Sequence, residues 1–297
     1  MAACVTRAWL TLGTLTMPLE DEDGRWFMTE LDLGYPEVRE VVNNRPDQDG
    51  VDDRTAFFGA RAVSASVTAV AWGPAKIDDV ASRFAPFMVP SARPVLHYVL
   101  DRPGAPERIL TVRAANYGFV VDNPDRRDIH LQWIAADPIV RDPTIQVATA
   151  WAGSSAGAGR AYNLTFPRTY PTGGGGGGTI GIAHPAGDLA VRPLLRIYGP
   201  VTAPRIFFAP SRGMFSMLST MTISTGQFVE VDCAAHTAWL NGDRTQNLLS
   251  QVNWTDIGAN GGWPLMPPGV DTYVQMQGSS TGAVTQVQVS WQDRFLS

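Results

Sequence analysis

The chain has 297 residues, of which 44% are hydrophobic and 17% are charged, and its formal net charge is −5. This length predicts two domains or one large β domain, and the hydrophobic content excludes an intrinsically disordered chain. The acidic balance argues against a nucleic-acid-binding protein, and no apolar run approaches the ~18 residues that a membrane-spanning helix needs.

The first half of the sequence predicts a β-rich domain. Strands are expected where apolar and polar residues alternate between turns marked by Gly, Pro and acidic residues. These strands cover residues 7–12, 25–33, 61–72, 95–100, 108–113, 129–133 and 145–151. In the strand at 61–72 the apolar phase changes near Ala69, which predicts a β-bulge or a change of sheet there.

The segment 43–53, NNRPDQDGVDD, separates two of these strands and is rich in acids. A calcium-binding loop is one reading, but the spacing lacks the terminal bidentate Glu of an EF-hand. We therefore interpret 43–53 as a solvated loop.

One convincing helix is predicted after residue 72. Its apolar residues recur at helical spacing: Ile77, Val80, Ala81, Phe84, Phe87 and Met88. Pro74 suits the start of the helix, and Pro86 disfavours helical backbone at Ala85, so the regular helix should end near there. Asp78 and Asp79 could form a catalytic dyad, but adjacent helical side chains do not face each other. We interpret them as acids that stabilise the first turns.

A composition shift follows the strand at 145–151. Residues 152–159 read AGSSAGAG, which is typical of a linker. We therefore expect two domains, 1–151 and 152–297, with a boundary loop at about 152–160. The first 150 residues hold 15 basic and 21 acidic side chains, and the rest hold 8 and 7, so the first half has a net charge of −6 and the rest has +1.

The second domain is predicted to be almost wholly β. Strands are expected at 189–197, 205–209, 221–224, 228–232, 237–240, 273–277 and 285–292, and their number and spacing favour a β-sandwich. In 226–242, GQFVEVDCAAHTAWLNG, Glu230 and Asp232 share one face, and Asn241-Gly242 supplies a turn that allows positive φ at both residues.

No constellation of residues marks an active site or a metal site. The histidines His97, His130, His184 and His236 stand alone. A hydrogen-bonded structural role is expected for His97, His130 and His236, which lie in strand-like segments. The run Gly173–Gly178 lacks the Lys and Ser/Thr of a phosphate-binding loop and predicts a flexible surface loop. The two cysteines, Cys4 and Cys233, have no ligand-spaced partners and predict neither a disulfide framework nor a metal site. No catalytic, cofactor-binding or metal-binding residue is therefore assigned.

Two weaker readings remain open for the second domain. Glu230 and Asp232 lie about 7 Å apart by strand rise, a glycosidase-like separation that is also ordinary for a solvated face. Exposed aromatic residues could bind sugars, although most should lie in the core. The candidates are Trp239, Trp254, Trp263, Tyr273 and Trp291.

Sequence blocks along nearly the whole chain resemble a phage distal tail protein, also called a minor tail protein, of long-tailed, non-contractile phages. In the first half these blocks are LGYPEVREVVNNRPDQDG, DDRTAFFGARAVSASVTAV and WIAADPIV. In the second half they are LLRIYGPVTAPRI, GQFVEVDCAAHTAWLNG, GGWPLMPPGVDTYVQMQ and WQDRF. The glycine run at 173–178 has no counterpart that we can place in this pattern.

The resemblance implies a mainly β protein with an N-terminal β-sandwich domain, carrying one helix and a hairpin, and a C-terminal galectin-like sandwich. It implies a structural virion protein without enzymatic activity or cofactors. Six copies would form a ring at the distal end of the tail, through contacts that the sequence does not identify. The ring would join the tail tube protein to the tail-tip hub and fibre proteins and surround a channel for the tape measure protein and DNA.

The same resemblance implies synthesis in a bacterial host cytoplasm, no membrane partner and no sequence-specific nucleic-acid partner. The N-terminus, MAACVTRAWLTLG, also lacks the pattern of a secretory signal. The acidic first domain could line the channel and avoid retaining DNA. The alternative is a carbohydrate-binding or lectin-like tail-tip module.

Overall fold

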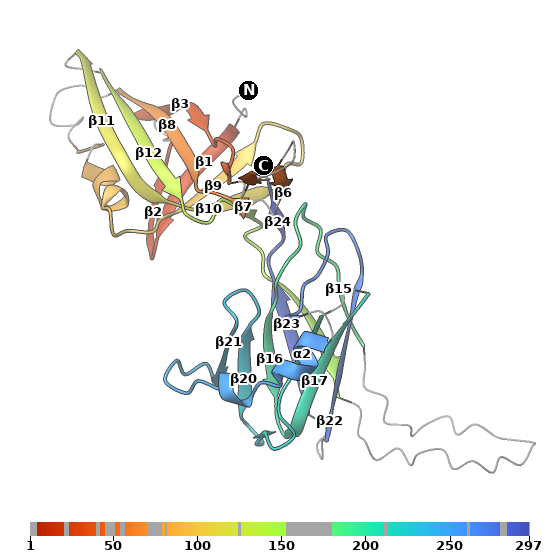
Figure 1. The fold of residues 1–297 in the computed structure, drawn as a ribbon. Coiled ribbons are helices and arrows are strands. Elements are labelled where there is room, and N and C mark those ends of the chain that lie inside the picture. Colours follow the sequence, from red (N-terminus) through yellow and green to blue (C-terminus); the bar gives the residue numbers. More distant parts are fainter. Residues whose placement is uncertain are drawn as a thin grey trace, which may run out of the picture. The chain divides into compact units, whose positions relative to one another are not determined.

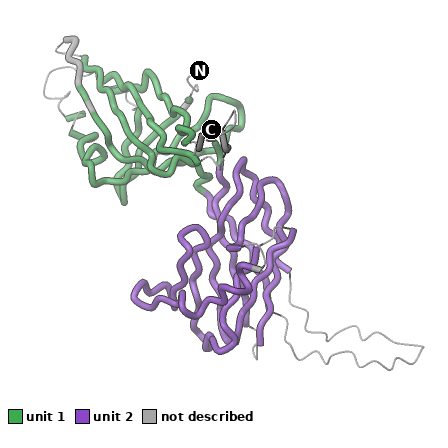
Figure 2. The backbone as a smooth tube through the Cα atoms, in the orientation of Figure 1, with its two compact units in different colours: residues 1–143, 295–297 green, residues 144–294 purple. Residues whose placement is uncertain are grey.

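The computed structural model describes residues 5–20, 24–39, 42–44, 51–53, 57–70, 79–80, 82–123, 126–152, 180–210, 213–259, 262–279 and 284–296. The chain divides into two compact units (Figure 2). Unit 1 is Met1–Pro143 with Phe295–Ser297, and unit 2 is Thr144–Arg294. Antiparallel sheets dominate both units, which confirms the predicted mainly β class. Within the described ranges, no helix is long and apolar enough to cross a membrane.

The observed division differs from the predicted boundary at 152–160. Strand β14 (Gln146–Trp151) pairs along its whole length with β23 (Gln286–Trp291), so it belongs to unit 2. Composition marks 152–159 as linker-like, but it does not reveal whether such a segment lies between two domains or inside one. The long-range partner of the preceding strand decides this.

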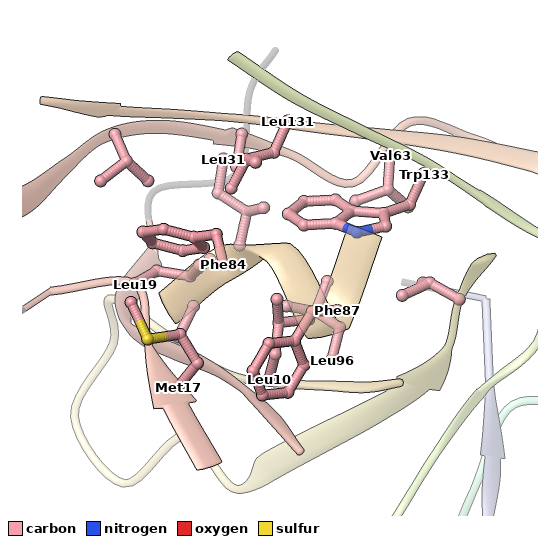
Figure 3. Packing of buried hydrophobic residues seen from close by; sticks show 14 of the residues in the cluster. Leu10, Met17, Leu19, Leu31, Val63, Phe84, Phe87, Leu96, Leu131 and Trp133 are labelled. Carbon is pink, nitrogen blue, oxygen red and sulfur yellow. The ribbon is translucent and has the colours of Figure 1, made fainter. Parts of the chain in front are cut away.

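Unit 1 is a sandwich of two sheets, with strand orders β2-β1-β9-β10-β13-β24 and β11-β12-β8-β3 (Figure 1). The strands are β1 (Val5–Leu12), β2 (Leu15–Pro18), β3 (Trp26–Asp32), β8 (Arg61–Val70), β9 (Val95–Leu100), β10 (Glu107–Thr111), β11 (Arg113–Asn123), β12 (Arg126–Ala135), β13 (Val140–Arg141) and β24 (Arg294–Phe295). Side chains from both sheets form one core (Figure 3). The predicted strands at 7–12, 25–33, 95–100 and 108–113 are confirmed within two residues at each end, and the one at 129–133 is confirmed inside the longer β12.

The predicted irregularity near Ala69 is wrong. Strand β8 pairs with β12 without a register shift from Arg61 to Val70, and Ala69 stays on the buried face while Val70 points outward. The bulge lies instead on β3, where the register against β8 shifts between Met28 and Glu30. The sequence suggested a change in the apolar phase of the strand because Val70 is apolar although its side chain is exposed.

The predicted helix is present and ends as Pro86 requires. Residues 79–80 and 82–84 are helical, and the 3-10 helix η1 (Ala85–Met88) follows directly. The side chains of Val80, Phe84, Phe87 and Met88 are buried and close one side of the unit 1 core. Ile77, Ala81, Pro74 and Asp78 lie outside the described residues.

Part of the predicted loop at 43–53 forms paired backbone. Strands β4 (Val38–Arg39) and β7 (Phe57–Phe58) pair antiparallel, and β5 (Val42–Asn44) and β6 (Val51–Asp53) pair in the same sense farther along. The two pairings are concentric, so they belong to one hairpin. The sequence missed them because Asn, Asp and Pro dominate the segment.

The last described residues return to unit 1. The Arg61 guanidinium donates a hydrogen bond to the Leu296 carbonyl oxygen, and the Arg108 guanidinium lies 3.5 Å from the centre of the Phe295 ring. Unit 1 is therefore assembled from two separate parts of the sequence, and the chain passes between the units twice.

Unit 2 is a second sandwich, with sheets ordered β14-β23-β16-β20-β21 and β15-β22-β17-β18. Its remaining strands are β15 (Gly181–Ala183), β16 (Leu194–Tyr198), β17 (Val201–Ala209), β18 (Gly213–Ser216), β19 (Thr222–Ile223), β20 (Phe228–Asp232), β21 (Thr237–Leu240) and β22 (Thr272–Ser279). Buried valine, isoleucine and aromatic side chains from both sheets form its core. The glycine run at 173–178 lies outside the described residues.

The hairpin at 226–242 follows its sequence pattern. Asn241 and Gly242 adopt φ of 52° and 70°, as a tight turn with two left-handed residues requires. Two helical segments after it were not predicted: η2 (Leu249–Gln251) and α2 (Trp254–Ala259). The start of α2 had a readable signal, because the Asn253 side chain accepts a hydrogen bond from the Asp256 amide.

Candidate functional site

The four histidines lie apart, each with its own partners. His97 lies 2.6 Å from Glu107 and 2.9 Å from Thr11, and it stacks on Trp9. The others contact one polar neighbour each: His130 with Ser66, His184 with Asp271, and His236 with Arg192. These contacts fit the predicted structural roles and bring no two histidines together.

The two carboxylates of β20, Glu230 and Asp232, both make structural contacts. Glu230 Oε2 lies 3.0 Å from Arg196 Nε, Arg244 is 3.8 Å from the other oxygen, and Glu230 is 8% exposed. Asp232 accepts hydrogen bonds from the Ala234 and Ala235 amides and shapes the turn after β20. An acid paired with two arginines and an acid that caps a turn do not form a glycosidase dyad.

One acid of the predicted helix likewise forms a structural contact. Asp79 makes an ion pair of 3.1 Å with Arg83 one helical turn later, while Asp78 lies outside the described residues. Groups of three or more His, Cys, Asp or Glu side chains that could hold a metal ion are absent from the part of the chain that the structure describes.

Burial perturbs two protonation sites in unit 1. Burial lowers the pKa of Arg61, and it raises the pKa of the neighbouring Tyr98 to about 12, an increase that Arg61 and Arg108 partly offset. The Tyr98 hydroxyl is buried without a hydrogen-bond partner among the described atoms. Both groups lie in the packed interior, so they bear on stability rather than on chemistry.

The five aromatic candidates of the second domain divide between core and surface. Trp291 is buried, Trp239 and Trp263 are half-buried, and Trp254 and Tyr273 are exposed. Trp263 stacks on His236 at 5.0 Å, and Trp254 meets Trp263 edge-on at 5.8 Å. Among these five candidates, Trp254, which is 52% exposed, is therefore the aromatic side chain most available to a ligand.

Further exposed apolar side chains gather on the first unit, and sequence reasoning missed them. Tyr35, Val38, Phe57 and Phe58 are all exposed and lie on or beside the β4–β7 pairing. We call these four residues the apolar ribbon. One signal was present: adjacent strand residues point to opposite faces, so Phe57 and Phe58 cannot both be buried by one sheet.

The same unit contains an apolar hollow of about 490 Å³. Its lining comes from η1, the turn after it and the start of β11: Ala85, Met88, Val89, Pro90, Ala114, Ala115 and Asn116. We call it the η1 hollow. Six of its seven lining residues are apolar, which suits it to a nonpolar side chain better than to a charged ligand.

Comparison with known proteins rests on solved structures. No family model and no curated protein matches the chain. The crystal structure of the Dit protein of phage SPP1, described as a paradigm of the hub adsorption apparatus in phages that infect Gram-positive bacteria, is similar with a TM-score of 0.63 and 11% identity, over 97% of this chain and 99% of that one. A chain of the phage P2 baseplate in its activated conformation with Ca has a TM-score of 0.48 and 9% identity, over 97% of each chain. The first likeness shows a shared fold across both units.

Proposed function

We propose that the protein is a structural component of a phage tail tip. The supporting observation is that the fold of both units, in order and over 97% of the chain, is similar to that of the SPP1 Dit protein. A fold shared at 11% identity does not carry function by itself. The sequence blocks that resemble distal tail proteins point independently in the same direction, and the engaged carboxylates and scattered histidines offer no competing active site.

In this role, six copies form a ring at the distal end of a long, non-contractile tail. The ring joins the tail tube protein to the tail-tip hub and fibre proteins, and it surrounds the channel for the tape measure protein and DNA. Unit 1 forms the ring, and unit 2 is the galectin-like domain. The protein is made in the host cytoplasm, becomes part of the virion and needs no enzymatic activity or cofactor.

Charge suits this arrangement. Residues 1–150 have a net charge of −6 (15 basic against 21 acidic) and the rest have +1 (8 against 7). A negative channel wall repels passing DNA and prevents it from being retained. If the acids of 20–53 map to the outer rim of an assembled ring, this part of the proposal fails.

Antibody labelling of intact particles tests the tail-tip role. Gold-conjugated antibodies against this chain, applied to particles of the phage that encodes it, should decorate the end of the tail farthest from the capsid. Labels along the whole tube, on the capsid, or only in the lysate without particles would refute the role. As a control, antibody preincubated with an excess of the purified chain should no longer label the particles.

A second function, carbohydrate binding by unit 2, is favoured by the exposed Trp254 next to Trp263. Exposed aromatic rings stack on the apolar faces of sugars. A glycan array with the wild-type chain and the Trp254→Ala variant separates the two functions. A specific hit lost in the variant supports the carbohydrate-binding module, whereas an array without specific hits removes it.

A further inference from the structure

Arg192 differs from three other arginines of unit 2 in its partner. Arg196, Arg205 and Arg244 lie 3.0, 3.0 and 3.8 Å from a carboxylate oxygen. The exposed Arg192 instead donates a hydrogen bond of 2.7 Å from Nη1 to His236 Nε2. Because a guanidinium can only donate, Nε2 accepts this bond and carries no proton. Among the described residues, Arg192 therefore keeps its positive charge without an acidic partner, and its other N–H groups remain available.

His236 is held in place by its backbone and by its ring. It lies in the turn between β20 and β21, where its φ of 55° is one that non-glycine residues seldom adopt. Asp232 uses its carboxylate to cap this turn, accepting hydrogen bonds from two backbone amides. The His236 ring stacks on Trp263 at 5.0 Å. The Arg192 guanidinium is thus bonded to a group that is itself fixed, which is the preorganisation that favours binding.

An aromatic surface continues from Trp263 to solvent. The buried Phe215 supports Trp263 from the core at 5.6 Å, and Trp254 meets it edge-on at 5.8 Å. Trp254 is 52% exposed, so one large ring beside a firmly packed one is open to a ligand. Asp256, two residues after Trp254, is paired with Arg205 at 3.0 Å, so its negative charge is neutralised.

These contacts form an unbroken chain from Trp254 through Trp263 and His236 to Arg192. The two ends of the chain differ in chemistry. An exposed aromatic ring stacks on the apolar face of a sugar. A guanidinium with available N–H groups binds carboxylate or phosphate, often through two parallel hydrogen bonds. A ligand that matches both ends therefore carries a sugar ring and an acidic group.

We propose that these residues bind an acidic glycan, with a sugar ring on Trp254 and a carboxylate or phosphate group on Arg192. Trp263 and His236 lie between the two ends and hold them in place. The inference rests on the second proposed function, carbohydrate binding by unit 2, and names the class of glycan. A neutral glycan can use the aromatic end alone, so the acidic group should raise the affinity.

The test applies the full chain to an array of glycans that bear uronic acid, sialic acid or phosphate, each printed beside its carboxyl-reduced or dephosphorylated form. Specific hits should be acidic glycans, and the arms of the array separate carboxylate from phosphate. In titrations of the strongest hit, Arg192→Gln should weaken binding about tenfold and leave the neutral form unaffected. Trp254→Ala should weaken both forms by a similar factor. The matched control Arg244→Gln removes the same charge from another exposed arginine of unit 2 and should leave the affinity unchanged.

Three results would overturn the inference. Equal weakening by Arg192→Gln and Arg244→Gln would show that binding follows the net charge of unit 2 and not this site. Hits confined to neutral glycans would refute the acidic ligand and leave carbohydrate binding by unit 2 standing. An array without specific hits would remove both the inference and the second function, while the antibody labelling of particles still decides the tail-tip role independently.

Discussion

The return of Phe295 to unit 1 predicts a measurable stabilisation of that unit. The Phe295 ring packs against the unit 1 core, and the buried Arg108 guanidinium lies 3.5 Å from its centre. A fully buried Phe→Ala change costs about 3–5 kcal/mol. Because Phe295 is only partly buried, the packing loss should be about half of that, and loss of the cation–π contact should add about 1 kcal/mol. We expect Phe295→Ala to destabilise unit 1 by about 2.5–3.5 kcal/mol.

Amide hydrogen exchange measures this effect unit by unit. In Phe295→Ala, slowly exchanging amides of β9 and β10 should exchange about 70- to 370-fold faster, as about 2.5–3.5 kcal/mol implies. Amides of β16 in unit 2 should keep their rates and serve as an internal control. Phe295→Leu keeps most of the packing and loses the ring, so its effect should be about 1 kcal/mol. The reasoning is refuted if Phe295→Ala changes β10 exchange less than about threefold, or if Leu and Ala have equal effects.

Three further predictions follow from buried or strained positions. The stability of unit 1 should fall between pH 10 and about 12, because the pKa of Tyr98 is raised to about 12 in the folded protein and the unfolded chain releases this proton first. Tyr98→Phe should remove that pH dependence without loss of stability at pH 7, because the Tyr98 hydroxyl is buried without a hydrogen-bond partner among the described atoms. Chemical denaturation of both proteins across this pH range measures the effect. Burial raises the pKa of the Cys233 thiol well above its usual value, so in a Cys4→Ser background it should react with a thiol reagent only after unfolding, and rapid labelling of the native protein would contradict its burial. Asn241→Ala should destabilise unit 2 by about 1–2 kcal/mol and Asn241→Gly by less, because φ is 52° there and the Asn241 side chain accepts a hydrogen bond from the Phe228 amide; equal melting temperatures for the two variants would refute this.

Local sequence patterns predicted the strands that have one face on a core and the other face outside it. The alternation in β8 and β23 gave the correct buried faces, because each strand has one face on a core and one outside it. Pro86 correctly ended the helix, and Asn241-Gly242 correctly gave the hairpin turn, because both effects act within a few residues.

Features that depend on distant partners could not be read in this way. The unit to which β14 belongs is decided by β23, about 140 residues later, and no local pattern encodes that pairing. The β5–β6 pairing lies in a segment whose composition favours a loop, and only the concentric β4–β7 pairing places it in a hairpin. Of the candidate sites, the sequence named the aromatic residues of unit 2 but did not separate the exposed Trp254 from the buried Trp291.

Because unit 1 is built from two separate segments of the sequence, a fragment of the chain is a poor tool for studying its surfaces. A fragment ending at Pro143 would lack Phe295, which packs on the core, and Leu296, whose carbonyl oxygen accepts a hydrogen bond from the buried Arg61. A buried guanidinium that loses its acceptor destabilises the fold around it. Failure of such a fragment to associate would therefore report the loss of Phe295 and Leu296 as much as the absence of a contact. Only variants of the full chain, altered at exposed positions, separate the folding of unit 1 from its assembly.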